Sequence, residues 1–263
     1  MKFLTTHYHF NLLNDNDRLS SFYEAINDFF LLNNSDDLNI LDIGCGSGIL
    51  SYFIACNTNS NIIAIEKDKK TYETAKENLK NFKNIEILNL DILDFKSDVK
   101  FDLIICEMLD TALIDEEEVL ALNHIHENLK ESSKIIPEGI INIAELAYTN
   151  REYIHNEDDS IKNSYEILSK AINYSNYNFS SNINPKFQSS LEFTVCKNSK
   201  INSIKITTFT KLSKNIICGP TPMLNPPLFI PIDEINVLKG DKIAIDLEYI
   251  MGQGLETIKT NLR

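Results

Sequence analysis

Short apolar runs alternate with amphipathic segments along the first half of the chain. The apolar runs lie at residues 38–43, 61–66, 85–90 and 101–106. The amphipathic segments lie at residues 17–30, 48–56, 67–82 and 116–130. Apolar runs of this length are typical of parallel strands buried on both faces, and the segments between them have helical spacing. The alternation predicts an α/β fold with a doubly wound, Rossmann-like sheet, whose fifth strand lies at residues 134–148 after a proline-containing turn.

The pattern changes after about Thr149. Strands are predicted at residues 191–197, 203–212 and 242–250, with polar or turn residues between them. Residues 160–172 have a helical pattern, and the polar stretch 173–186 is predicted to be a mobile connection. We therefore predict three parts, namely an N-terminal helical segment over residues 1–37, an α/β domain over 38–148, and a smaller β-rich, barrel-like domain over 149–263.

Composition narrows the class of protein. The chain has 263 residues, of which 43% are hydrophobic, so it can bury a sizeable core. No apolar run approaches the roughly 18 residues that span a bilayer, and the first residues lack the pattern of a signal peptide. The five cysteines show no paired C-x-x-C spacing, so neither a metal site nor a disulfide framework is predicted. A protein of the reducing cytoplasm, without a membrane partner, is expected.

The charge balance bears on partners. The net charge is −13 and the pI is near 4.8. This balance argues against general nucleic-acid binding through the phosphate backbone, so RNA is disfavoured as a partner, although sequence leaves a local basic patch open. A basic segment of a protein, or a small molecule, is compatible with it.

The most informative local motif is ILDIGCGSGIL at residues 40–50. Gly44, Gly46 and Gly48 follow a predicted strand and open a helix, where glycine lets the backbone turn sharply and approach a ligand closely. Their spacing is G-x-G-x-G, which differs from the dinucleotide fingerprint G-x-G-x-x-G. Asp42 ends the strand just before this turn.

Acidic residues also end the next two predicted strands. Glu66 follows Gly44 by 22 positions, where an acid can bind both hydroxyls of a ribose. Asp91 ends the third strand at the same edge of the sheet. In open α/β sheets the ligand lies in the crevice at the carboxyl ends of the strands. For Asp91, a role as the cap of a following helix stays open as the alternative.

This arrangement resembles the class I S-adenosylmethionine-dependent methyltransferases over residues 38–147, with D-I-G-C-G-S-G as the specific motif. The resemblance implies S-adenosylmethionine as the cofactor, covered by the N-terminal helical segment. It implies glycine-loop contacts to the methionine moiety, Glu66 at the ribose, and Asp91 with Ile92 at the adenine. The predicted cofactor site is completed by Asp42, Cys45 and Lys67, which adjoin these positions.

The segment CEMLDTALIDEEEV, residues 106–119, resembles the double-glutamate loop of protein arginine N-methyltransferases. Glu107 and Glu116 match the two glutamates of that family at the same separation of nine residues. HFNLLNDNDR, at residues 9–18, matches the N-terminal pattern of the family, and a V-x-x-G-D turn recurs at residues 237–241. The resemblance implies that Glu107 and Glu116 are catalytic, that Glu107 also adjoins the cofactor, and that Arg18 binds the methionine carboxylate.

The chemistry explains why two carboxylates are wanted. A guanidinium is planar and delocalised, and its nitrogens are poor nucleophiles. Two glutamates clamp it and orient one nitrogen toward the sulfonium methyl group, so that catalysis is mainly positioning and preorganised electrostatics. In the alternative interpretation, Asp115 caps a helix with Glu118 as its reciprocal partner. The acids at 116 and 117 are then first-turn residues that the helix dipole stabilises. We favour this explanation for Glu117 and Glu118 and leave it open for Glu116.

Two departures from the family concern the acceptor. The Thr-His-Trp loop of the family is replaced by Asn225, Pro226 and Pro227, and the chain has no tryptophan. No segment matches the helical dimerisation arm, so the oligomeric state stays open. We predict an S-adenosylmethionine-dependent N-methyltransferase of a protein side chain, of the arginine type. The alternatives are methylation of RNA or of a small molecule, and a catalytically silent cofactor-binding module that acts by partner recognition.

Overall fold

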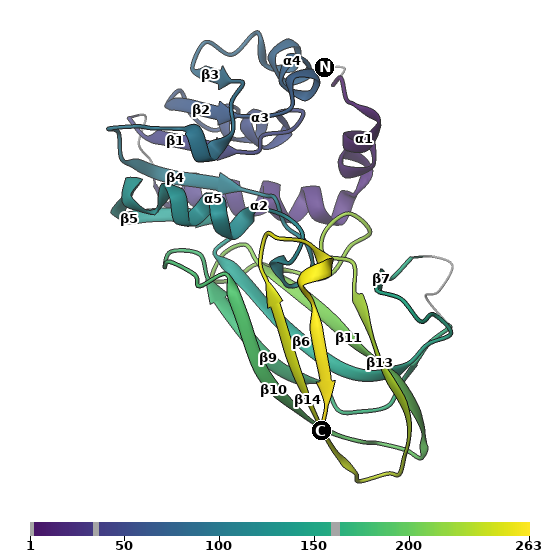
Figure 1. The fold of residues 1–263 in the computed structure, drawn as a ribbon. Coiled ribbons are helices and arrows are strands. Elements are labelled where there is room, and N and C mark those ends of the chain that lie inside the picture. Colours follow the sequence, from purple (N-terminus) through teal and green to yellow (C-terminus); the bar gives the residue numbers. More distant parts are fainter. Residues whose placement is uncertain (1–2, 34–36, 159–163) are drawn as a thin grey trace.

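A computed structural model describes residues 3–33, 37–158 and 164–263, without the side chains of His7 and Tyr8. It contains a parallel α/β unit and a β-rich unit, stacked one above the other in Figure 1. The two share one continuous hydrophobic core. This arrangement confirms the predicted fold class.

The first unit is built on a five-stranded parallel sheet with the order β3-β2-β1-β4-β5. Its strands are β1 Asn39–Ile43, β2 Asn61–Ile65, β3 Ile85–Leu88, β4 Phe101–Cys106 and β5 Leu129–Ile136. The central strands are almost wholly buried, which explains their unbroken apolar runs. The strand order reverses between β1 and β4, and the crevice at their carboxyl ends is where such sheets bind ligands.

The helices flank this sheet. They are α1 His7–Asn14, α2 Asn16–Leu32, α3 Ile49–Ala55, α4 Lys69–Leu79 and α5 Glu118–Ile125, with short 3-10 turns η1 Ile92–Asp94, η2 Thr111–Leu113, η3 His126–Asn128 and η4 Leu255–Thr257. Asp15 caps α2 by accepting from the Arg18 N–H at 3.1 Å, and Asp68 caps α4 from the Thr71 N–H at 2.8 Å. None of the helices in the described ranges is long and apolar enough to cross a membrane.

The second unit is antiparallel. One sheet has the order β7-β13-β11-β6-β8, with β9 added on β6 and β12 on β11, and a three-stranded sheet has the order β10-β14-β15. The strands are β6 Gly139–Tyr148, β7 His155–Asn156, β8 Glu166–Ile167, β9 Ile172–Asn178, β10 Lys186–Thr194, β11 Ser199–Lys211, β12 Ile217–Cys218, β13 Leu228–Val237, β14 Lys242–Ile250 and β15 Lys259–Leu262.

Three local predictions were wrong. The strand predicted at 134–148 is two strands in different sheets, because β5 completes the parallel sheet up to Ile136 whereas β6 pairs antiparallel with β11. The helix predicted at 160–172 is not formed over 164–172, where β8 and the start of β9 pair with β6; residues 160–163 lie outside the described ranges. The connection predicted at 173–186 begins with most of β9. In each case pairing with a distant strand overrides the local pattern.

The chain therefore passes from the parallel sheet to the antiparallel one near Pro137, before the domain boundary that we predicted at residue 148. Helix α2 packs against α3 and β12, so it connects the two units. The assignment of the units to cofactor and acceptor stays a prediction at this point.

Candidate active site

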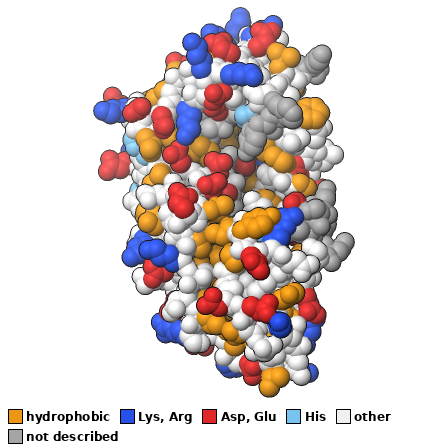
Figure 2. All heavy atoms as spheres, turned by 45° about the vertical axis from the view of Figure 1, so that its right-hand side comes forward, with side chains coloured by type: hydrophobic (Ala, Val, Ile, Leu, Met, Phe, Trp, Pro, Cys, Tyr) orange, Lys and Arg blue, Asp and Glu red, His pale blue; other side chains and the backbone are white. Residues whose placement is uncertain are grey.

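A pocket lies at the carboxyl ends of β1, β2 and β4, where the strand order reverses. It encloses about 1040 Å³ of space when the open solvent at its mouth is included. Figure 2 shows a hollow on this face of the molecule, with several acidic side chains around it. The predicted residues that line the pocket are Arg18, Gly44, Cys45, Gly46, Glu66, Lys67, Asp91, Ile92, Glu107 and Glu116.

The glycine loop forms the floor of the pocket. Gly44 and Gly46 have φ values of 66° and 56°, in the left-handed region that glycine tolerates. A Cβ on Gly44 would lie 2.8 Å from the Met108 side chain, and one on Gly46 would lie 2.9 Å from the His9 ring. The loop therefore requires glycine both for its backbone conformation and for the space that these neighbours occupy.

Two predicted residues do not line the pocket. Asp42 is 1% exposed and accepts a hydrogen bond from the Ser51 hydroxyl at 2.5 Å, and burial raises its pKa to about 7. Gly48 is the N-terminal cap of α3, with a φ of 86°, and a Cβ there would lie 2.6 Å from Leu79. Both residues shape the turn from the side away from the pocket.

Glu66 ties the end of β2 to the glycine loop. Its Oε2 accepts from the Gly46 N–H at 3.0 Å and its Oε1 from the Asp68 N–H at 2.8 Å. Burial raises the pKa of this carboxyl, although both hydrogen bonds oppose the shift. Asp91 lines the pocket and also caps η1, since its side chain accepts from the Leu93 N–H at 2.9 Å, as the capping alternative predicted.

Arg18 and Glu107 form a buried ion pair through Nη2 and Oε2. Their side chains are 4% and 11% exposed, and the guanidinium also lies over the Phe22 ring. Burial raises the pKa of Glu107, and the charge of Arg18 opposes that shift. Arg18 Nε is buried without a hydrogen-bond partner in the described part of the chain. Arg18, which lines the pocket, thus keeps one N–H donor that no described residue uses.

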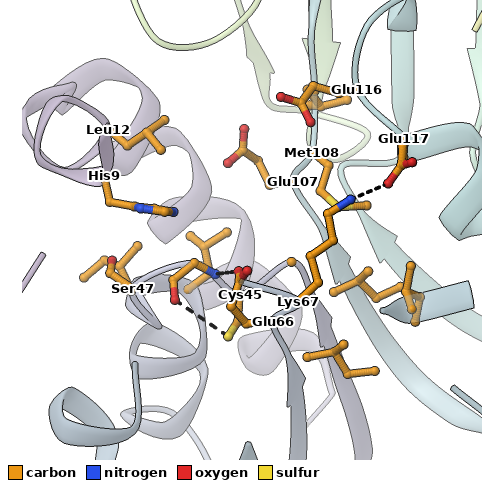
Figure 3. A pocket seen from close by; sticks show the side chains of 18 of the residues that line it. His9, Leu12, Cys45, Ser47, Glu66, Lys67, Glu107, Met108, Glu116 and Glu117 are labelled. Atoms are coloured by element: carbon orange, nitrogen blue, oxygen red, sulfur yellow. Dashed lines mark hydrogen bonds and ion pairs between the residues drawn. The ribbon is translucent and has the colours of Figure 1, made fainter. Parts of the chain in front are cut away.

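Glu116 lies on the same side of the pocket as Glu107 (Figure 3). It is exposed to solvent at the surface but partly desolvated by its surroundings, and its pKa is raised first by that desolvation and then by the charges of Asp115 and Glu107. Beside it, Glu117 accepts from Lys67 Nζ at 2.7 Å across the pocket. The structure therefore brings the two predicted catalytic carboxylates into one cavity.

The roles of two nearby carboxylates were not revealed by the sequence, namely Asp110, which lies between Glu107 and Glu116, and Glu118, the first residue of α5. Asp110 accepts from the N–H groups of Ile114, Asp115 and Glu116 at 3.1, 3.0 and 3.2 Å. Glu118 is 0% exposed and accepts from the Met108 N–H at 2.9 Å. The predicted capping pair of Asp115 and Glu118 is therefore wrong, since the N-cap of α5 is Glu117, without a side-chain cap bond.

The β-rich unit reaches the site through the turn after β12. Asp15 Oδ2 accepts from the Thr221 hydroxyl at 2.5 Å and from the Met223 N–H at 3.0 Å, and Met223 lines the pocket. Asn225 is buried on Thr210, and the Pro226 carbonyl accepts from the Thr111 hydroxyl at 2.7 Å. Asp15 of the N-terminal motif thus accepts from Thr221 and Met223. Asn225 and Pro226, which align with the Thr-His-Trp loop, contact other residues.

Sequence reasoning missed several apolar or neutral residues that line the pocket. Among them, His9 and Met108 pack against the glycine loop, and Met223 donates to Asp15. His9 belongs to the N-terminal motif, which was the available signal for it. Burial lowers the pKa of His9, and the positive charge of Arg18 adds to that effect. Met223 had no local signal, because its place depends on a contact with Asp15 across 208 positions.

Comparison with known proteins identifies the fold and its chemistry. A family described as a methyltransferase domain matches residues 34–198, more than half of the chain. The chain belongs to this methyltransferase family. An uncharacterized protein of Methanothermobacter thermautotrophicus is 39% identical to this methyltransferase over 264 residues, covering 100% of both chains. The ribosomal protein L11 methyltransferase of Thermosipho melanesiensis is 36% identical over 105 residues, which cover 40% of this chain and 38% of that protein.

A solved structure is similar over nearly the whole methyltransferase. The Trypanosoma brucei PRMT1 enzyme-prozyme heterotetrameric complex with AdoHcy matches with a TM-score of 0.79 and 15% identity, covering 98% of this chain and 96% of that chain. At this identity the likeness shows the fold. The protein is a class I methyltransferase that uses S-adenosylmethionine as its cofactor and resembles protein arginine methyltransferases in architecture.

Proposed function

We propose that this methyltransferase methylates a nitrogen of a protein side chain, of the arginine type, with Glu107 and Glu116 as its catalytic pair. The observation that carries the proposal is the convergence of these two carboxylates on one pocket beside the glycine loop. A strand end and a helix start have no structural need to direct two acids into the same cavity. Their mutual repulsion is relieved when a cation lies between them.

The remaining pocket residues suit the parts of the cofactor. The cradle of Gly44 and Gly46, with Cys45 between them, admits the methionine moiety, and the unpaired Nε of buried Arg18 suits its carboxylate. Glu66 offers two carboxylate oxygens to the ribose hydroxyls, with Lys67 at its side. Asp91 and Ile92 lie at the end where the adenine would be bound. Asp42 and Gly48 act indirectly, by shaping the glycine turn.

The charges favour a cationic acceptor. Five acidic residues line the pocket, against two basic ones; the acids are Glu66, Asp91, Glu107, Glu116 and Glu117, and the bases are Arg18 and Lys67. Both bases already bind glutamates, Arg18 with Glu107 and Lys67 with Glu117. A guanidinium has five N–H donors, so it can donate to the carboxylate oxygens of both Glu107 and Glu116. A phosphate would be repelled by the same carboxylates.

The reaction requires the acceptor nitrogen to be held in line with the sulfonium methyl group that the bound cofactor supplies. The nitrogen lone pair forms the new C–N bond while the C–S bond breaks, and the sulfur keeps that electron pair. Glu107 and Glu116 draw the positive charge of the guanidinium toward the other two nitrogens. The proton that the methylated nitrogen then loses passes to one of these carboxylates and from there to water.

Transfer from methyl-labelled S-adenosylmethionine into a cell extract tests this proposal, with the extract separated afterwards into protein, RNA and small-molecule pools. Glu107→Gln, which keeps the size of the side chain and removes its charge, is compared with the wild-type chain. We expect label in the protein pool on arginine, reduced at least about 10²-fold by the substitution. Label in RNA or in a small molecule, or transfer that is indifferent to Glu107, would contradict arginine as the acceptor. Cofactor binding without transfer into any pool would support the silent binding module.

A further inference from the structure

Each glutamate of the proposed pair is held through its backbone by a second carboxylate. Asp110 receives three consecutive N–H groups, of which the last belongs to Glu116. Glu118 receives the N–H of Met108, the residue that directly follows Glu107. Asp110 and Glu118 therefore fix the two ends of the loop that carries the pair.

The loop between these anchors is strained. Ala112 and Leu113 have φ values of 62° and 63°, a left-handed conformation that is unfavourable for residues with a Cβ. Each such residue costs about 1–3 kcal/mol and persists only where the surroundings enforce it. Both residues are fully buried. A loop of this kind would relax if its hydrogen bonds were removed.

The β-rich unit supplies the other restraints. The Ala112 N–H donates to the Thr208 hydroxyl at 2.9 Å. The Leu113 carbonyl accepts from the Gly252 N–H at 3.0 Å, and the Ile114 carbonyl accepts from the Gly254 N–H at 3.0 Å. The loop is thus held by Asp110 on its own side and, from the β-rich unit, by the Thr208 hydroxyl and two backbone N–H groups.

We propose that Asp110 and Glu118 are positioning residues for methyl transfer, which hold the backbone of Glu116 and Glu107 so that their carboxylates meet the acceptor in one fixed geometry. This inference rests on the proposed function of the glutamate pair. It assigns to the two acids no contact with the acceptor or the cofactor, because neither Asp110 nor Glu118 lines the pocket.

Folding alone does not account for acids at these two positions. Burial, with a smaller contribution from neighbouring carboxylates, raises the pKa of Asp110 to about 7 and that of Glu118 to about 8. Glu118 also keeps one buried oxygen, Oε1, without a partner among the described residues, which is costly. An apolar side chain would avoid burying a carboxyl group, but it would leave these loop N–H groups without their acceptor. The oxygen atoms that accept from the loop backbone are the feature that such a replacement would lose.

Four variants, one of which is a matched control, test the inference. Asp110→Asn replaces one of two accepting oxygens by an amino group, which cannot accept from the loop N–H groups. Glu118→Leu removes the acceptor of the Met108 N–H, whereas Glu118→Gln keeps an accepting oxygen and serves as its matched control. Glu107→Gln reports on the proposed function itself. For each variant, S-adenosylhomocysteine binding is measured by calorimetry, and amide hydrogen exchange is measured over residues 107–118.

Transfer of labelled methyl groups to extract protein is then measured at saturating cofactor, with the extract protein varied to separate the maximal rate from the half-saturating concentration. We expect Asp110→Asn and Glu118→Leu to lower the maximal rate about 10²-fold, because a displacement near 1 Å has such an effect. We expect Glu118→Gln to keep the rate within about fivefold of wild type, because its amide oxygen can still accept from the Met108 N–H. The affinity for S-adenosylhomocysteine should change less than about threefold, because neither Asp110 nor Glu118 lines the pocket and separate sites are nearly independent.

The amides of Ile114, Asp115 and Glu116 should exchange faster in Asp110→Asn. Wild-type transfer rates in Asp110→Asn and Glu118→Leu, with Glu107→Gln inactive, would overturn the positioning role and leave the proposed function standing. Transfer that survives Glu107→Gln would overturn the proposed function, and unchanged exchange in Asp110→Asn would independently show that Asp110 does not hold the loop.

Discussion

The two sides of the pocket that we propose bind the cofactor and the acceptor, called here the cofactor side and the acceptor side, are built in different ways. On the cofactor side, Gly46, Glu66 and Asp91 follow three strands of one parallel sheet, and each lies where its own strand ends. On the acceptor side, the loop of residues 107–118 is held by Thr208, Gly252 and Gly254 of the other unit. On this proposal, local sequence specifies the cofactor side, whereas long-range contacts specify the acceptor side.

The largest effect is expected when two adjacent acids of the acceptor side are substituted one at a time and the variants are compared. Glu116→Gln removes a carboxylate of the proposed pair, whereas Glu117→Gln, one residue later, removes only an exposed ion pair with Lys67. We expect the first to lower kcat by about 10²- to 10³-fold and the second by less than about fivefold. Steady-state transfer with both variants measures the difference. If Glu116→Gln also weakens cofactor binding tenfold, the two sides of the pocket are not separable.

A smaller effect, on affinity rather than on kcat, is expected on the cofactor side. Gly46→Ala adds a Cβ at a φ of 56° and 2.9 Å from the His9 ring. We expect S-adenosylhomocysteine to bind about 10- to 100-fold more weakly, since strain and crowding of this kind cost about 1–3 kcal/mol.

Gly240→Ala is the matched control for this substitution. Its φ of 97° also disfavours a side chain, but no atom lies within 4 Å of the added Cβ. Calorimetric titration should show unchanged affinity in that variant. Equal weakening in both variants would mean that the loss arises from general destabilisation rather than from the pocket.

The smallest effect concerns stability and pH. Burial raises the pKa of Glu118 to about 8, above its value in the unfolded chain, so the folded state binds this proton more tightly. Its contribution to the free energy of unfolding is therefore present at low pH and is lost as the pH rises from the usual glutamate range through about 8, by at most about 1.4 kcal/mol per pH unit. Glu118→Gln should flatten this slope in urea unfolding between pH 5 and 8, whereas Glu131→Gln, at an exposed position of β5, should not. A slope that Glu118→Gln leaves intact would refute this origin.

The extent of sequence-based prediction follows the same division. The glycine loop and the acids after β2 and β4 were predictable because a strand, its end and the next helix are encoded by neighbouring residues. The role of Asp110 was not, because its three acceptor bonds depend on a loop conformation with two left-handed residues. Met223 depends on Asp15, and β9 depends on β6, so neither shows in its own local pattern. Residues 134–148 had one continuous apolar pattern although the chain changes sheets within them.

The clamp by Gly252 and Gly254 has a consequence for how this enzyme can diverge. The bonds run from backbone N–H to backbone carbonyl, so they constrain the path of the chain, and the φ values of 71° and 93° at these two glycines also disfavour any side chain there. A substitution of either glycine would therefore disturb the clamp, as would an insertion or deletion in this turn. A chimera that joins this α/β unit to the β-rich unit of another methyltransferase should bind S-adenosylmethionine yet fail to turn over, unless the length of that one turn is kept.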